Sequence, residues 1–460
     1  MAAPQRIAPG QLEAGLLPTL PRLDIEPEWK TQQRLWGHAF HPMCSYLAMF
    51  PAALAHAFIA RYSRPGDVVF DPFSGRGTTP LQACAEGRVG VGNDLNPMAH
   101  LLTAAKLDPP SRPALTTRMN LLRVEYSLAE VRWTQLAVMA LERAGSAGYA
   151  VPGAGGTPGS APMPTEVALA FHPRTLAQVL FLRATLRADD PTDRFLIGAM
   201  IGILHGRSPT YLSDIMPNTF SMAPRYVRDF VARTGFVPAE RDAFACLDAK
   251  LRRLLRQGLP AQRGIALLGD ARDAGTRARH ALRQRALPDR ARLVVTSPPY
   301  LRVVKYGYYN WLRLWFMGVD PEAVDRSLDD AHHLDAYLVF LRQTLADLRG
   351  ALTDDAVVVM VIGDVELDRG RAMQGGVGLA ETVWERAAAP EGYRLAGIAL
   401  DDIAAQRKMT KIWGTEAGRT TKTDRLLVMS PTDQGRRRAL AGASLPIDWT
   451  WPSETRLRAV

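Results

Sequence analysis

The sequence predicts an α/β protein in which a mainly helical domain is inserted into a mostly parallel sheet. Short apolar runs alternate with helical patterns in two parts of the chain, whereas residues 109–261 between them show helical patterns only. The runs are continuously apolar, which is typical of parallel strands that are covered on both faces. Aspartate, glycine or serine residues follow several of the runs directly. Open α/β sheets bind ligands at that edge, so we expect the functional site there.

The expected elements follow in chain order. The predicted strands are residues 68–70, 89–92, 265–268, 293–296, 356–362, 393–400 and 425–429. One helix is expected after the first strand, through Leu81 and Ala85. Another is expected over residues 335–352, where Leu338, Leu341 and Leu345 share one face. The inserted region opens with two prolines and has amphipathic helical stretches at 176–186 and 226–255.

These elements divide the chain into three parts. Residues 1–35 form an N-terminal extension, residues 36–108 and 262–460 form a discontinuous sheet domain, and residues 109–261 form the inserted helical domain. Within the insertion, residues 144–164 are rich in glycine, proline, serine and alanine. Such a segment buries too little apolar surface to offset the entropy of ordering it, so we expect a mobile loop.

Composition excludes several classes of protein. The 460 residues carry 56 Lys+Arg against 46 Asp+Glu, a formal charge of +10, and 47% are hydrophobic, as in ordinary globular proteins. No apolar run approaches the ~18 residues of a membrane helix, and the N-terminus lacks a secretory signal pattern. Three distant cysteines exclude a disulfide framework and a cysteine-rich zinc site. We expect a cytoplasmic protein without a metal, and the basic charge alone does not identify a polyanionic partner.

A glycine-rich turn follows the first strand. Residues 71–79 read DPFSGRGTT and lead into the first helix. Glycines there allow a tight turn and let a ligand approach the amides at a helix N-terminus. The Walker pattern fails, which disfavours a nucleoside triphosphate, and the dinucleotide GxGxxG pattern fails as well. Asp94 at the next strand end is placed to accept from ribose hydroxyls, and Asp270 at a third strand end to accept from an adenine amine. Without these aspartates, the turn alone would indicate only a tight connection.

Residues 296–300, TSPPY, end another strand. Two prolines fix the backbone, so a carbonyl, the Ser297 side chain and the Tyr300 ring are expected to form a small pocket for a planar amine. The lone pair of such an amine is delocalised into its ring, and two acceptors would favour the localised form that can attack a methyl group. A base with this amine is inaccessible within a duplex and would have to be flipped out. A proline-rich turn is the alternative interpretation.

Together, DPFSGRGTT, NDLNP, GDARD and TSPPY resemble the amino-group DNA methyltransferases, which methylate cytosine N4 or adenine N6 with S-adenosylmethionine. The resemblance covers about residues 36–108 and 264–430, implies a Rossmann-like class I methyltransferase fold, and has the α-type motif order. The insertion would then be the target-recognition domain. The implied catalytic residues are Ser297, Pro298, Pro299 and Tyr300. The implied cofactor-binding residues are His41, Phe50, Pro51, Asp71, Pro72, Phe73, Gly75, Gly77, Thr78, Thr79, Asp94, Leu95, Asn96, Asp270, Ala271 and Thr296.

The resemblance also bears on the base. Members with serine at the first catalytic position usually methylate cytosine N4, so we expect N4 in preference to adenine N6. Methylation at cytosine C5 would need a thiolate nucleophile, and none of the three cysteines lies in a Pro-Cys dipeptide or next to the TSPPY motif. The expected substrate is double-stranded DNA with the base flipped out, and any cognate restriction endonuclease would be a separate chain.

Basic and aromatic residues suggest where DNA would bind. The expected contacts are Lys305, Tyr306, Arg207, Lys408, Lys411 and Arg419. Trp311 and Trp315 are expected to pack in the core, and each arginine among residues 252–292 is taken singly as a solvated helix residue. The segment 217–222 with His205 is taken as a helix connection in preference to a base reader, and His205 as structural.

Two rival functions differ in class. An RNA or protein-glutamine methyltransferase would use the same kind of proline-proline-aromatic site. The basic insertion favours a large polyanion over a peptide but does not separate DNA from RNA. A DNA-binding module with a vestigial methyltransferase fold would have lost a cofactor or catalytic motif, and both motifs are intact here.

Overall fold

The computed structural model describes residues 20–33, 35–47, 49–144, 151–156, 163–217, 219–299, 305–328, 333–363, 378–402 and 423–450. Within these residues one seven-stranded sheet has the order β3-β2-β1-β4-β5-β7-β6. The strands are β1 Val68–Asp71, β2 Val89–Asp94, β3 Ile265–Leu268, β4 Ala291–Thr296, β5 Leu352–Gly363, β6 Arg394–Asp402 and β7 Thr423–Ser430. All predicted strands are present, and the predicted Rossmann-like, mostly parallel sheet is confirmed.

The order of the strands changes direction at the middle of the sheet. From β1 the chain moves outward through β2 and β3 and then returns to β4 on the other side of β1, with all four strands parallel. β5 continues the parallel set, and only β7 runs antiparallel to its neighbours β5 and β6. The strand order therefore reverses between β1 and β4. Open α/β sheets bind ligands outside the carboxyl ends of their strands at such a switch point.

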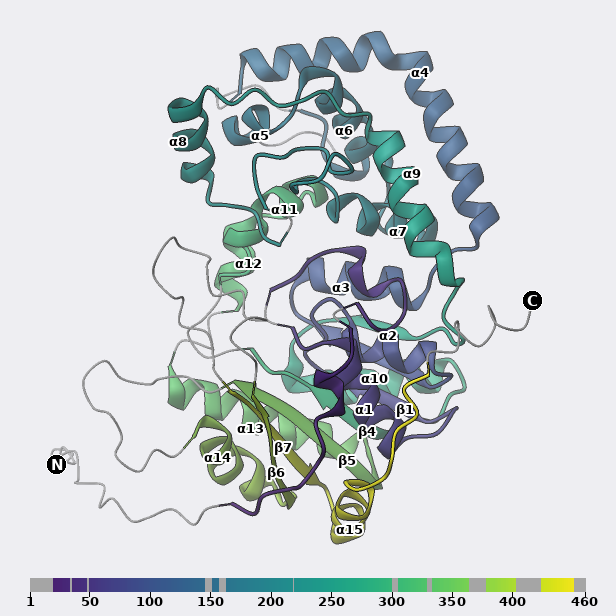
Figure 1. Cartoon of the computed structure of the whole chain (residues 1–460), viewed down its shortest axis with the longest axis vertical. Helices are drawn as coiled ribbons and strands as arrows, with labels where there is room; N and C mark the ends of the chain where they lie inside the picture. Colours follow the sequence, from purple (N-terminus) through teal and green to yellow (C-terminus); the bar gives the residue numbers. More distant parts are fainter. Residues whose placement is uncertain are drawn as a thin grey trace, which may run out of the picture.

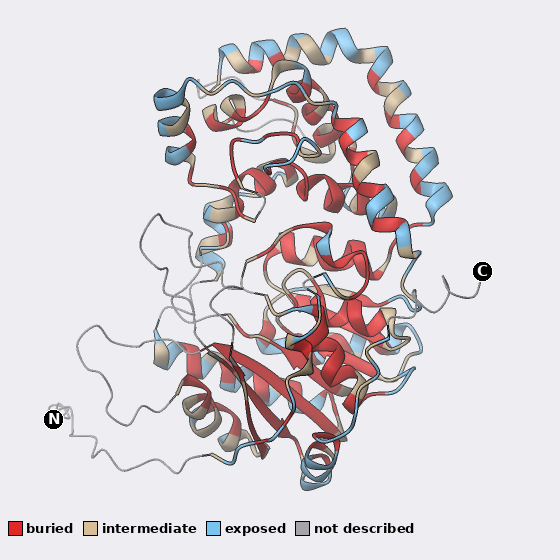
Figure 2. Cartoon of the chain, viewed as in Figure 1, coloured by how far each residue is buried: buried red, intermediate tan, exposed pale blue. Residues whose placement is uncertain are grey.

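Both faces of the sheet are buried, as the continuous apolar runs predicted. In β5, Val357, Val359 and Val361 pack into one cluster, and Val358 and Met360 pack into the other. The first face is covered by α1 Ala52–Tyr62 and α15 Asp433–Gly442. The second is covered by α10 Ala274–Gln284, α13 Leu334–Gly350 and α14 Leu379–Val383. Figure 2 shows the strands as buried along most of their length.

Helices form a second part of the molecule beyond the sheet (Figure 1). Those from the insertion are α4 Arg112–Glu142, α5 Thr165–Ala170, α6 Pro173–Thr185, α7 Pro191–Ile201, α8 Pro224–Thr234 and α9 Ala243–Leu254. α11 Trp311–Met317 and α12 Pro321–Ser327 follow the TSPPY segment. The helical stretch expected at 226–255 is in fact two helices. Gly235 ends α8 with a left-handed φ of 63°, and Pro238 follows, so one helix cannot continue.

The helical part shares its core with the sheet part. One hydrophobic cluster joins Leu81 of α2 Thr78–Ala85 and Leu102 of α3 Pro97–Leu107 to Leu176 and Leu247 in the helical part. None of the described helices is long and apolar enough to span a membrane.

Two segments expected to be peripheral are partly packed. Val151, within the expected mobile loop, is buried, and Arg183 donates to the Pro152 carbonyl. The rest of that tract lies largely outside the described residues. In the expected N-terminal extension, Trp29 is buried and Leu23 donates its backbone N–H to Ile398 on β6. These residues pack against the sheet and contribute to its core.

Candidate active site

The glycine-rich turn after β1 folds as a tight loop against β2. Gly75 and Gly77 have positive φ angles of 51° and 79°, which L side chains rarely adopt. The Ser74 N–H donates to the Asn93 carbonyl at 2.9 Å. A side-chain Cβ at Gly77 would lie 2.7 Å from the Thr103 hydroxyl of α3. The sequence therefore needs glycine at position 77 for both conformation and space.

Asp94, at the end of β2, binds this loop through its carboxylate. One oxygen accepts from the Gly75 N–H at 2.7 Å and the other from the Asn96 N–H at 2.9 Å. Burial raises the pKa of Asp94 to about 6, although these amide bonds oppose the rise. An ionised carboxylate has about four acceptor positions, so acceptor capacity remains for a ligand hydroxyl.

Asp71 and Thr296 join the two strands at the switch point. The Thr296 hydroxyl donates to Asp71 at 2.5 Å, from the end of β4 to the end of β1. The Phe73 N–H donates to the same carboxylate oxygen at 3.1 Å. Burial raises the pKa of Asp71 to about 7, and the Thr296 hydrogen bond opposes the rise. The glycine loop and the TSPPY segment are thus tied together at their first residues.

Ser297 directly follows β4 and contacts the neighbouring strand β5. Its hydroxyl donates to the Val361 carbonyl at 3.1 Å. Because that bond uses the only hydroxyl proton, the oxygen keeps lone pairs that can accept from an amine. Pro298 is buried and Pro299 is half-buried. Tyr300 lies outside the described residues.

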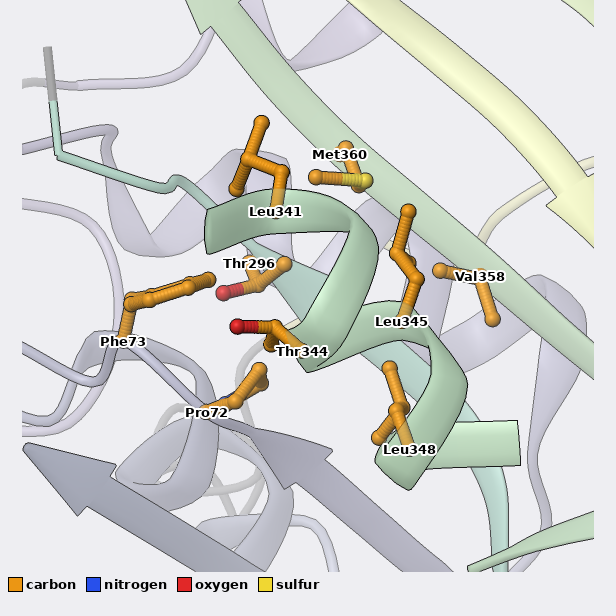
Figure 3. Close-up of a pocket in the computed structure, with 9 residues that line it drawn as sticks. All are labelled: Pro72, Phe73, Thr296, Leu341, Thr344, Leu345, Leu348, Val358 and Met360. Atoms are coloured by element: carbon orange, nitrogen blue, oxygen red, sulfur yellow. The ribbon is translucent and has the colours of Figure 1, made fainter. Parts of the chain in front are cut away.

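A small apolar cavity lies behind this point (Figure 3). It is lined by Pro72, Phe73, Thr296, Leu341, Thr344, Leu345, Leu348, Val358 and Met360. In Figure 3 the hydroxyl groups of Thr296 and Thr344 point to the same side, next to the Phe73 ring. The Thr344 hydroxyl donates to the Phe340 carbonyl of its own helix at 3.0 Å. The switch point is therefore backed by apolar side chains of α13.

Asp270, after β3, has a charged partner. Arg272 donates to it through its backbone N–H at 2.9 Å and through its guanidinium, at 2.6 Å to one oxygen. Hydrogen bonding from Arg272 lowers the pKa of Asp270, so the carboxylate stays ionised. The Arg272 guanidinium also lies over the Phe340 ring, which contacts Phe73. A ligand amine at Asp270 would share this carboxylate with Arg272.

The upstream segment contributes a buried histidine. His41 donates through its Nε2–H to the Gln82 Oε1 of α2 at 2.9 Å, while its Nδ1 is buried without a hydrogen-bond partner among the described residues. Burial lowers its pKa well below the ordinary value, so the ring is neutral. Phe50 packs against the cluster under α1, and Pro51 is exposed at the start of that helix.

The other predicted cofactor residues line the loops. Thr79 donates to the Val295 carbonyl at 2.9 Å, and Asn96 caps α3 by accepting from the Met98 N–H. Pro72, Thr78 and Ala271 are buried, whereas Leu95 is half-buried. The structure brings the residues from Asp71 to Thr79, Asp94 to Asn96, Asp270 and Thr296 to one edge of the sheet.

Sequence reasoning missed two groups at this edge. Asn93 donates to the carbonyls of Pro72 and Gly269, and it accepts from Arg277 at 2.9 Å. Those contacts join the loops after β1, β2 and β3. Tyr46 accepts from Asn96, and its ring stacks on Tyr306 at 5.7 Å. The only sequence feature that could have indicated Asn93 is its position next to Asp94. No sequence feature indicates that Tyr46 contacts Tyr306.

The predicted DNA contacts are less closely grouped. Lys305 and Arg207 are exposed, whereas Tyr306 is half-buried in its stack on Tyr46. Lys408, Lys411 and Arg419 lie outside the described residues. His205 bonds Pro217 and Ser221 through its two ring nitrogens, which agrees with a structural role.

Several arginines and tryptophans named in the sequence analysis make contacts within the chain. Arg279 and Arg283 of α10 both pair with Asp289. Trp311 is buried and donates to the Met222 carbonyl, and Trp315 lies under the Arg183 guanidinium. No group of metal-ligating side chains is found within the described part of the chain.

These residues fit a nucleoside-type cofactor with an amino acid arm. The site offers carboxylates at three strand ends, a glycine loop with left-handed backbone, and a buried His41 nitrogen that lacks a partner among the described residues. A neutral imidazole nitrogen and carboxyl oxygens are acceptors that suit the hydroxyl and amine donors of such a molecule.

Comparison with known proteins agrees with the motifs. Residues 20–105 match the DNA methylase family of N6 and N4 methyltransferases. The chain is 36% identical over 70 residues to the type II methyltransferase M.MjaII of Methanocaldococcus jannaschii, covering 15% of this chain and 13% of that protein. It is 43% identical over 49 residues to the orphan methyltransferase M.BamHII of Bacillus amyloliquefaciens, covering 11% and 18%. It is 36% identical over 77 residues to the type II methyltransferase M.SmaI of Serratia marcescens, covering 16% and 26%.

A solved structure also aligns with the chain. It is the rRNA methyltransferase aviRa from Streptomyces viridochromogenes, with a TM-score of 0.31, 12% identity, and coverage of 86% of this chain and 89% of that one.

The chain spans between 13% and 26% of the length of the three curated relatives. Over the matched segment the predicted resemblance to amino DNA methyltransferases is confirmed. The methyl donor implied by this family and fold is S-adenosylmethionine.

Proposed function

We propose that this protein is a site-specific DNA methyltransferase that transfers a methyl group to the exocyclic amine of a flipped-out base, with cytosine N4 as the preferred position. The observation that carries the proposal is the junction between the glycine loop and the TSPPY segment. Asp71 and Thr296 tie the two together, and Ser297 follows at the next residue. A cofactor on the loop and an amine at Ser297 would be neighbours across the switch point.

In this proposal the loop and the strand ends bind the cofactor. Asp94 accepts from ribose hydroxyls, Asp270 from the adenine amine, and the loop from Asp71 to Thr79 holds the methionine arm with His41. S-adenosylmethionine supplies an electrophilic methyl group when bound. The protein's contribution is to hold the amine in line with that group in a dry pocket, because positioning removes much of the entropic barrier.

Ser297 would accept from the target amine. Its proton is used by the Val361 carbonyl, so its oxygen can only accept from a further donor. A second acceptor from the Pro298 backbone would bind the other amine hydrogen and localise the nitrogen lone pair. The amine nitrogen would accept the methyl group from the sulfur of S-adenosylmethionine, and the amine would release one proton to solvent. Tyr300 would stack on the flipped base.

Site-specific action would depend on the helical part. We propose that residues 109–261, including Arg207, recognise the target sequence together with Lys305, Lys408, Lys411 and Arg419. The exposure of Arg207 and Lys305 supports this assignment. Phosphate contacts by such side chains position a protein on DNA, and contacts to base edges specify the sequence.

Nucleoside mass spectrometry tests the reaction. Purified protein with S-adenosylmethionine is incubated with DNA or with RNA, and each product is digested to nucleosides. We expect N4-methylcytosine in DNA from the wild type and its loss in Ser297→Ala. The matched control is Ser63→Ala, because that hydroxyl also donates to a carbonyl, that of Ile59, at the end of α1 that precedes β1.

Each alternative has its own product. N6-methyladenine in DNA would keep the mechanism and overturn the preference for cytosine. Methylation of RNA alone would contradict the DNA substrate. Full turnover by Ser297→Ala would contradict the role of the serine.

A further inference from the structure

The outer face of α4 carries an apolar stripe, which we define as Leu121, Val124, Leu128, Val131 and Val138. All five side chains are exposed, with Leu128 at 83% and Val131 at 72% of their full accessibility. The spacings of three, four, three and seven residues place them on one side of the helix. Figure 1 shows α4 at the outer edge of the helical part, and Figure 2 shows exposed residues along it.

Folding does not require this stripe. The opposite face of α4 holds Leu122, Tyr126, Ala137 and Ala140, which are buried in the hydrophobic cluster with α6. The stripe residues take no part in that cluster. Contiguous exposed apolar side chains on a protein surface mark interaction sites more often than scattered ones do. The stripe therefore has the pattern of a helix that packs on both faces, with its second partner outside the chain.

Charged residues flank the stripe in a self-complementary way. Glu125 and Arg132 lie seven residues apart on the same side of it, and Leu128 and Val131 lie between them in the sequence. Arg118 lies 3.8 Å from Glu125 and is itself bonded to Asp193. Arg132 is exposed and makes no ion pair within the described part of the chain. One acid and one base at this spacing match an antiparallel copy of the same helix.

We propose that a second copy of this chain docks on the stripe, with α4 against α4 about a two-fold axis. In the antiparallel arrangement Leu128 packs against Val131 of the partner subunit, and Glu125 faces the partner's Arg132. Two-fold symmetry then makes each contact twice, as in isologous dimers. Figure 1 shows α4 bending around the helical part, so the contact is centred on the middle of the helix and does not extend over its whole length. The dimer is independent of the proposed methyl transfer.

Sedimentation velocity over a wide range of concentration tests the dimer. We expect the wild type to sediment as a dimer, and Leu128→Arg to sediment as a monomer with an unchanged circular dichroism spectrum, because the side chain is exposed on its own chain. Val237→Arg is the matched control, since Val237 is 80% exposed elsewhere on the helical part. It should leave the dimer intact. A wild type that stays monomeric, or a dimer that persists in Leu128→Arg, overturns the proposal.

A charge exchange tests the antiparallel register. Glu125→Arg and Arg132→Glu should each raise the dimer dissociation constant about tenfold, the effect of a coupling of ~1.4 kcal/mol. The double variant should restore the dissociation constant, because the opposed pair is re-formed with its charges exchanged. Single variants without effect, or a double variant weaker than either single one, contradict this arrangement.

Discussion

Asp71 shows how the site depends on single buried groups. Its carboxylate is buried and accepts hydrogen bonds from the Thr296 hydroxyl and the Phe73 amide. These hydrogen bonds stabilise the carboxylate, but the loss of its hydration disfavours the ionised form more strongly. The pKa of Asp71 is therefore raised to about 7. Near neutral pH its protonation therefore changes easily.

The stability of the protein should depend on this titration. The pKa of Asp71 rises from 3.8 to about 7, so the folded state binds the proton more tightly than the unfolded state does. The contribution of Asp71 to stability is then most favourable below about pH 4 and is lost as pH rises toward about 7. Between about pH 4 and pH 7 the titration of Asp71 should lower the free energy of unfolding of the wild type by an amount on the order of 4 kcal/mol. Asp71→Asn should not show this decrease. Urea unfolding of both proteins at several pH values measures it, and parallel stability curves would contradict the expectation.

At the residue scale the sequence predicted the types of side chain at the site but not their partners. Asp94 and Ser297 were found because they follow apolar runs within recognisable motifs. Arg272 was not expected as a partner of Asp270, and Tyr46 was not expected beside Tyr306. Such pairings depend on tertiary distances that a linear pattern does not contain.

At the scale of elements, the loops at the strand ends act as one unit. Asn93 bonds the loops after β1 and β3, and Asp94 bonds the Gly75 amide and its own following turn. All predicted strands formed, because each is a continuous apolar run in a sheet covered on both faces. The helix expected at 226–255 did not, because Gly235 provides a left-handed end.

Two glycine substitutions in the loop should distinguish the effect of the left-handed backbone from the effect of steric contact with α3. Gly77→Ala places a Cβ 2.7 Å from the buried Thr103 hydroxyl in addition to a left-handed backbone, whereas Gly75→Ala meets nothing closer than the Tyr46 ring at 3.6 Å. Both lose about 1–2 kcal/mol to the backbone. We expect a clearly larger fall in melting temperature for Gly77→Ala. Equal falls in melting temperature would show that steric contact with α3 is not the reason for glycine at position 77.

At the scale of the whole molecule, the helical part shares a hydrophobic cluster with α2 and α3 of the sheet domain. The cluster that contains Leu176 and Leu247 also contains Met43, Leu81 and Met98. The sequence predicted an insertion from the change in pattern at residue 109. It did not predict the shared core, because apolar periodicity shows which face of a helix is buried and not what covers it.

Calorimetry should show whether the helical part and the sheet unfold together. Multi-domain proteins commonly unfold in more than one step, whereas a shared core couples its parts. We therefore expect a single thermal transition with a calorimetric enthalpy equal to the van't Hoff enthalpy. Two resolved transitions would mean that the helical part unfolds independently of the sheet.

The central claim is that the edge formed by Asp71, Asp94 and Ser297 binds the methyl donor beside the acceptor amine. The most direct measurement is a crystal structure of the protein with S-adenosylhomocysteine. We expect the ribose hydroxyls within hydrogen-bond distance of Asp94 and the sulfur between the glycine loop and Ser297. A ligand bound away from the carboxyl ends of β1, β2 and β4 would contradict the claim.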